Sequence, residues 1–104
     1  MIKVNVTIQK DKVKSLLVSG HANSGEYGKD LVCAAVSAVV IGGLNSLENH
    51  ANYLIEIIDG YVSLTAKSLA NDHDEVVLDT IITSLLTIEQ NYRKYIQITQ
   101  ERTD

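Results

Sequence analysis

The chain has 104 residues, of which 45% are hydrophobic and 21% are charged, and its formal net charge at pH 7 is −4. This length and composition are ordinary for one folded globular domain, which we place over residues 1–104. Lysine and arginine are scattered without a basic run. Net acidity and scattered cations disfavour nucleic-acid binding through phosphate contacts, so we expect no direct contact with nucleic acid.

Cysteine usage and hydropathy bear on where the protein works. The only cysteine, Cys33, cannot form an internal disulfide, which fits a reducing cytoplasm. Residues 1–10 lack the apolar core of a signal peptide. The longest uncharged run, residues 31–47, is shorter than the ~20 apolar residues of a membrane-spanning helix. We expect a cytoplasmic protein without a membrane partner.

The chain begins with a predicted hairpin. Apolar and polar residues alternate over residues 2–9, and this period of two is typical of a half-buried strand. The apolar positions of this strand are Ile2, Val4, Val6 and Ile8. A polar turn follows, and residues 13–19 are predicted to return as the second strand.

A glycine-rich loop and a helix are predicted next. Residues 20–30 contain three glycines and are expected to form a mobile active-site loop. Asp30 stands immediately before an apolar run, where the N-cap of a helix is expected. The predicted helix, residues 31–49, places Cys33 in its first turn. Its internal Gly42-Gly43 pair costs about 1 kcal/mol per glycine relative to alanine, so we expect another segment to approach closely there.

The second half of the chain predicts another hairpin and another helix. Residues 53–58 and 61–66 have the pattern of strands, and Asp59-Gly60 between them is a strong signal for a two-residue turn. The second helix is predicted over residues 72–92, with Asp72 as the start of a capping box and apolar residues on one face.

A short strand at residues 96–98 completes the predicted order ββαββαβ, and the polar residues 100–104 are expected to fray. Two hairpins and two helices predict an α+β fold: a single-domain sandwich with two helices packed on a mostly antiparallel sheet.

His21 and Cys33 are the candidate catalytic residues, because a histidine beside a thiol can take its proton and leave a thiolate nucleophile. The glycines between them allow the chain to fold back and bring the side chains within the ~3–4 Å that this step needs. A helix N-terminus would favour the thiolate and stabilise an oxyanion. Asp30 would orient His21 or cap the helix. Ser37 would bond to His21, the thiolate or a substrate, or back to the Cys33 carbonyl.

Structural explanations exist for the same residues. A lone cysteine in an apolar helix is commonly core packing, and a histidine in a glycine loop is commonly a surface residue. One cysteine and three dispersed histidines have no recognisable metal-ligand spacing, and His50 and His73 are expected at helix ends without a chemical role. The glycines do not match a phosphate-binding loop. We therefore expect neither a metal nor a cofactor.

A longer pattern joins the candidate residues. Gly20-His21-Ala22 is followed by Gly25-Glu26-Tyr27-Gly28, by Asp30 and by the run from Val32 to Ala38. This pattern resembles the signature of the ribosomal-processing cysteine proteases, the Prp family. Length, acidity and element order agree with that family along nearly the whole chain.

The resemblance implies a cysteine endopeptidase whose catalytic pair is Cys33 and His21. It implies a cytoplasmic homodimer that cuts the precursor of a large-subunit ribosomal protein, number twenty-seven of that series. The segment removed is an apolar N-terminal extension that ends in paired aromatics. The loop residues expected to close over the substrate are Gly20, Gly25, Glu26, Tyr27 and Gly28.

Two other functions stay open on the residues alone. A non-catalytic ribosome-assembly module would bind the same ribosomal protein in a groove, with Cys33 serving as packing. A small-molecule thiol hydrolase would need a deep preformed pocket, whereas the glycine-rich loop favours a flexible segment as ligand.

Overall fold

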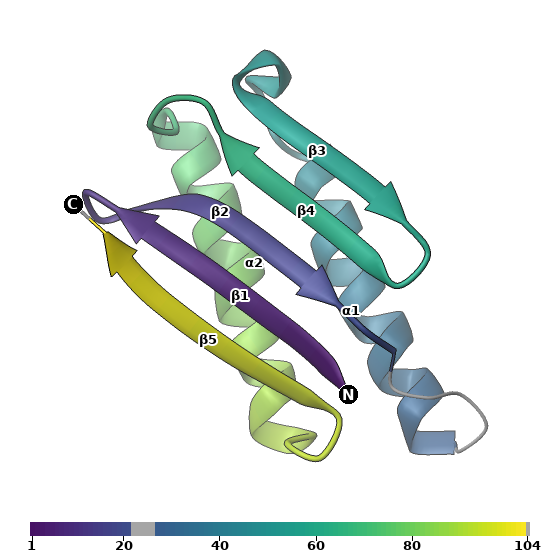
Figure 1. Ribbon diagram of the computed structural model, residues 1–104. Helices are drawn as coiled ribbons and strands as arrows, with labels where there is room; N and C mark the ends of the chain where they lie inside the picture. The colour runs from purple at the N-terminus through teal and green to yellow at the C-terminus, as the bar shows by residue number, and fades with distance from the viewer. Residues whose placement is uncertain (22–26, 104) are drawn as a thin grey trace.

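Two helices pack on one face of a five-stranded sheet (Figure 1). The computed structural model describes residues 1–21 and 27–103, and of residues 27–30 it describes the backbone only. In chain order the elements are β1 (Ile2–Gln9), β2 (Lys12–Ser19), α1 (Tyr27–Asn45), the short 3-10 helix η1 (His50–Asn52), β3 (Tyr53–Ile58), β4 (Tyr61–Ala66), α2 (Asp72–Asn91) and β5 (Ile96–Thr103). The predicted ββαββαβ sandwich is confirmed.

The strands lie in the order β3-β4-β2-β1-β5, which puts the first hairpin at the centre of the sheet. β1 is antiparallel to β2 and parallel to β5, and the other neighbours are antiparallel. The alternation predicted for the first strand is observed: Ile2, Val4 and Val6 are buried, whereas Lys3 and Asn5 are exposed. A period of two suffices here because helices cover only one face of the sheet.

β5 is longer than predicted. It pairs with β1 along its whole length, ending with Gln9 beside Thr103. The expectation that residues 100–104 fray is therefore wrong for residues 100–103. The N–H and C=O groups on the outer edge of β1 need partners, and backbone pairing satisfies them whatever the polarity of the incoming side chains.

α1 begins earlier than predicted. It starts at Tyr27, so Asp30 lies inside the helix instead of capping it, and Cys33 falls in the second turn. Among the residues of α1 whose side chains the structure describes, Val32 is the first apolar one that is buried. Apolar periodicity marks where a helix meets the core, not where its backbone hydrogen bonding starts. The loop predicted over residues 20–30 is correspondingly shorter, because residues 27–30 are helical.

The two helices approach each other at one glycine of the predicted pair. A Cβ atom added to Gly43 would collide with Cγ1 and Cδ1 of Ile81 on α2. A Cβ atom added to Gly42 would meet nothing within 4 Å. The expected close approach is thus correct for Gly43 and wrong for Gly42, which lies on the outer side of the helix. Around this contact α1 buries Val32, Val36, Val40 and Leu44, and α2 buries Leu78, Ile81, Ile82 and Leu85.

A buried carboxylate ties the connection after α1 to the first turn of α2. The fully buried Asp74 accepts hydrogen bonds from the backbone N–H groups of Glu48 (2.8 Å) and Asn49 (3.2 Å). It also accepts from the Tyr53 hydroxyl (2.9 Å) and from Nδ1 of His73 (2.9 Å). Burial by itself would raise the pKa of Asp74, but these bonds outweigh it and lower the pKa to about 2.

The same network sets the start of α2. The N-cap is Asn71, whose side chain accepts a hydrogen bond from the Asp74 N–H at 2.8 Å, and not the predicted Asp72. Burial, followed by the hydrogen bond to Asp74, raises the pKa of Tyr53 to about 12. Tyr53 is therefore a neutral donor to an ionised acceptor.

The contrast between the two glycines gives a matched pair of variants. Gly42→Ala and Gly43→Ala gain the same helix propensity, so their difference isolates the collision with Ile81. We expect Gly43→Ala to have an unfolding free energy lower than that of Gly42→Ala by about 1–3 kcal/mol. Urea denaturation of both variants measures this difference. Equal stabilities would show that Ile81 moves aside without cost.

Asp74 is expected to make the unfolding free energy depend on pH. Its pKa is about 2 in the folded protein and about 3.9 in an unfolded chain. Its stabilisation is therefore complete above about pH 5 and is lost as the pH falls toward 2. We expect Asp74→Asn to be less stable at pH 7 by roughly 2–3 kcal/mol, with the difference shrinking toward pH 2. Asp72→Asn, at an exposed position of the same turn, is the control. Stability curves of wild type and Asp74→Asn that stay parallel between pH 7 and pH 2 would contradict this role.

Candidate active site

A pocket of about 480 Å³ opens between α1 and the sheet, at the end where the β3–β4 turn lies. Its apolar walls come from both layers and consist of Ile2, Val18, Val36, Val40, Ile41, Ile57, Ile58 and Val62. Its remaining lining residues are Gly20, His21, Cys33, Ser37, Asp59, Gly60 and Tyr61. The pocket thus gathers the chemistry-bearing residues of the first half of the chain against the second hairpin.

Backbone hydrogen bonds fix the chain just before and just after the His21 Cα. Gly20, just after β2, has a φ of +95°, and its N–H donates to the Gly60 carbonyl at 3.0 Å. The His21 carbonyl accepts from the N-terminal ammonium of Met1 at 2.9 Å. A Cβ atom on Gly20 would collide with the Met1 carbonyl oxygen. Glycine is therefore required at this position by both its φ and its neighbour.

The His21 ring lies directly over Gly60. A Cβ atom added to Gly60 would collide with Nε2 of His21 and would lie 2.8 Å from Cε1 and 3.1 Å from Cδ2. The imidazole therefore contacts a backbone that carries no side chain, at the mouth of the pocket. Pairing of Ser19 with Tyr61 keeps the end of β2 beside this turn.

Cys33 enters the pocket from the second turn of α1. Its side chain is partly buried, packs against the hydrophobic core and lines the pocket with His21. The unpaired N–H groups of a helix belong to its first turn, and the effect of the helix dipole is confined to that turn. Because Cys33 lies in the second turn and not in the first, the structure does not support activation of its thiol by the helix N-terminus. Of the predicted activating groups, the one that shares the pocket is the imidazole of His21.

Ser37 also lines the pocket, one helical turn after Cys33, and is exposed. Asp30 lies three positions before Cys33 in the first turn of α1. Of the predicted substrate loop, Gly20 lines the pocket, whereas Tyr27 and Gly28 belong to the helix. Gly25 and Glu26 lie outside the described residues.

The second hairpin contributes residues that sequence reasoning did not assign to the site. Asp59 and Gly60 were predicted as a turn, and their place beside His21 depends on β4 pairing with β2. Ile57 and Ile58 of β3 also line the pocket, and they are 49% and 59% exposed. Their exposure is a property of the tertiary structure, and no pattern in the sequence predicted it.

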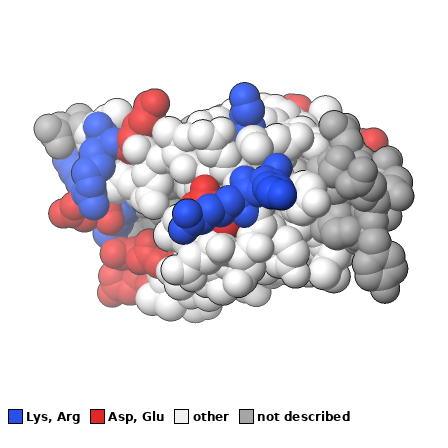
Figure 2. All heavy atoms as spheres, turned by 90° about the horizontal axis from the view of Figure 1, so that it is seen from below, with Lys and Arg blue, Asp and Glu red and all other residues white. Residues whose placement is uncertain are grey.

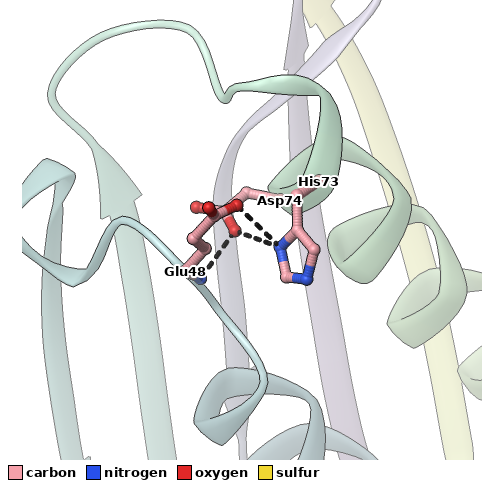
Figure 3. Close-up of side chains that lie close together, drawn as sticks. All are labelled: Glu48, His73 and Asp74. Atoms are coloured by element: carbon pink, nitrogen blue, oxygen red, sulfur yellow. Dashed lines mark hydrogen bonds and ion pairs between the residues drawn. The ribbon is translucent and has the colours of Figure 1, made fainter.

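A second cluster of titratable side chains lies at the opposite end of α1. Figure 3 shows Glu48, His73 and Asp74, whose candidate ligand atoms lie within 4.8 Å of one another. An ionised carboxylate has about four acceptor positions, and Asp74 already accepts four hydrogen bonds. Nδ1 of His73 lies 3.6 Å from Oε2 of Glu48 and 2.9 Å from Oδ1 of Asp74. We assign this cluster to stabilisation of the fold, because a cation would have to displace those donors.

Charges of both signs lie on the face that Figure 2 shows. In Figure 2, lysine and arginine side chains lie in small groups beside aspartate and glutamate, with uncharged surface between them. Neither α1 nor α2, as far as the chain is described, is long and apolar enough to cross a membrane.

Known proteins resemble this chain in both sequence and fold. Residues 1–97 match the family described as cysteine protease Prp. The ribosomal processing cysteine protease Prp of Bacillus subtilis (strain 168) is 35% identical over 108 residues, covering 95% of this chain and 96% of that protein.

Two crystal structures of the essential ribosomal processing protease Prp from S. aureus superimpose closely. The complex with a substrate peptide gives a TM-score of 0.85 at 32% identity, and the complex with a covalently linked product peptide gives 0.84 at 33%. Each comparison covers 97% of this chain and 100% of the other.

Proposed function

The chain belongs to the Prp family of cysteine proteases, and we propose that it removes the N-terminal extension of a large-subunit ribosomal protein, number twenty-seven of that series. As a cysteine protease it hydrolyses peptide bonds, and we assign this reaction to a Cys33–His21 dyad. The observation that supports this assignment is that Cys33 and His21 line the same pocket. No other cysteine exists in the sequence to supply a nucleophile.

The proposed reaction has two stages, acylation of Cys33 and hydrolysis of the resulting thioester. His21 takes the thiol proton of Cys33, and the sulfur attacks the scissile carbonyl carbon. The tetrahedral intermediate collapses to a thioester, and the departing amine takes its proton from His21. Water, deprotonated by the same imidazole, then attacks the thioester and releases the new carboxylate and the thiol. A peptide bound covalently to a relative of the same fold is consistent with this scheme.

The pocket walls suit an apolar segment. Val36, Val40 and Ile41 of α1 face the pocket from one side, and Ile57 and Ile58 of β3 line the other. Apolar walls around a few polar groups are typical of sites that bind apolar ligands. This lining supports an apolar extension as substrate, which the family resemblance also implies.

Supporting roles are proposed for two residues of α1. Ser37 lines the pocket one turn beyond Cys33, where its hydroxyl can bond to substrate or to the imidazole. Asp30 is the candidate for orienting His21. Closure of the segment between Gly20 and α1 over the substrate is part of the same proposal.

We also propose that the protein is a cytoplasmic homodimer. Exposed apolar side chains on the edge strand β3 support self-association, since Leu54 is 61% exposed and Ile58 is 59% exposed. The single cysteine supports a reducing compartment.

Cleavage of a peptide that spans the precursor junction tests the dyad. We expect Cys33→Ala to abolish cleavage and Cys33→Ser to retain peptide binding but lose cleavage, since a hydroxyl is a far weaker nucleophile with this base. His21→Ala should lower kcat by about 10²–10⁴-fold, the usual contribution of a general base. Circular dichroism checks that each variant folds. Undiminished cleavage by Cys33→Ala would remove Cys33 from the mechanism, whereas binding of the junction peptide without cleavage by the wild type would favour the non-catalytic binding module.

Thiol alkylation gives a second test that needs no substrate. Cys33 is the only cysteine, so iodoacetamide consumption reports on it alone. We expect alkylation at pH 7 to be faster in the wild type than in His21→Ala, because an adjacent imidazole favours the reactive thiolate. His50→Ala, which removes an exposed histidine that does not line the pocket, serves as the control. Equal rates in wild type and His21→Ala would contradict activation by His21.

A further inference from the structure

We propose that Gly60 is a positioning residue of the active site: its bare Cα supports the imidazole of His21 and so keeps the ring in the pocket that Cys33 lines. This inference rests on the proposed dyad. It adds a role for a residue of the β3–β4 turn, which lies far from the catalytic pair in the sequence.

The contact leaves no room for a side chain. Three atoms of the His21 ring lie within 3.1 Å of the position that a Gly60 Cβ would occupy. Real Cβ atoms essentially never have neighbours closer than 3.0 Å, and two of the three ring atoms fall inside that limit. Any other residue at this position would therefore push the imidazole away from its present place.

Gly60 also holds the backbone that carries the ring. Its carbonyl accepts the hydrogen bond from the Gly20 N–H, one residue before His21. Gly60 thus contacts both the backbone of Gly20 and the ring of His21. The His21 carbonyl also accepts a hydrogen bond from the Met1 ammonium, so hydrogen bonds hold the backbone just before and just after the His21 Cα. The absence of a side chain at Gly60 lets the ring occupy its present position.

Turn geometry offers a competing explanation for this glycine. Gly60 has a φ of +72°, a left-handed conformation that most residues adopt only with strain. Asparagine tolerates that conformation well, but it carries a Cβ atom. Gly60→Asn therefore relieves the backbone requirement and keeps the collision with His21, whereas Gly60→Ala suffers from both. The two variants separate the two explanations.

The test combines cleavage of the junction peptide with alkylation of Cys33. For Gly60→Asn and Gly60→Ala alike we expect kcat to fall at least tenfold and alkylation at pH 7 to slow toward the rate of His21→Ala. Thermal unfolding of Gly60→Ala in the wild-type and His21→Ala backgrounds measures the contact directly. The loss in Tm should be smaller when the imidazole is absent.

A failure of the role proposed for Gly60 can be told apart from a failure of the dyad. If His21→Ala is impaired but Gly60→Asn cleaves and alkylates like the wild type, Gly60 serves only the turn and the inference is overturned. It is overturned as well if the Tm loss is identical in the two backgrounds. If His21→Ala itself is unimpaired, the proposed dyad fails, while the Tm comparison still decides whether Gly60 supports the ring.

Discussion

The candidate active site depends on one backbone contact between two segments that are distant in the sequence. The Gly20 N–H donates to the Gly60 carbonyl at 3.0 Å, and the His21 ring lies on the same glycine. Antiparallel pairing of β2 with β4 brings these turns together at one end of the sheet. His21 is still exposed, but this pairing places its ring against Gly60. The imidazole therefore has a defined place beside the pocket.

The opposite end of α1 is fixed by a different interaction. Asp74 accepts hydrogen bonds from the chain that follows the helix and from Tyr53 at the start of β3. Gly43 lets α1 approach Ile81 of α2 closely. These contacts hold the helix against its neighbours at one end, and the pocket occupies the other end, between the helix and β3. The pocket that His21 and Cys33 line therefore lies away from these contacts, at the end of the sheet where β3 turns into β4 (Figure 1).

The position of Cys33 narrows how its thiol can be activated. Cys33 lies in the second turn of α1, beyond the first turn to which the unpaired N–H groups and most of the dipole effect belong. Proton transfer to His21 then carries most of the activation in the proposed mechanism. Donors for an oxyanion are then expected elsewhere in the pocket. Ser37 lies on the same helical face as Cys33, lines the pocket and carries a hydroxyl group.

Local patterns in the sequence determined the elements. The alternation in Ile2–Gln9 and the apolar face of α2 reflect which neighbouring residues are buried, and the Asp59-Gly60 turn reflects the positive φ that glycine adopts without strain. They determined the candidate pair as well, since His21 and Cys33 stand out by residue type and by their place around a glycine-rich segment. The start of α1 and the end of β5 were predicted wrongly, because backbone hydrogen bonding extends both elements beyond their apolar residues. Only the tertiary structure decided that Gly60, Ile57 and Ile58 belong to the site, that Gly43 and not Gly42 contacts α2, and that Asp74 is buried. Each of these depends on which strands and helices become neighbours, and that choice is made by long-range pairing and packing that no local pattern encodes.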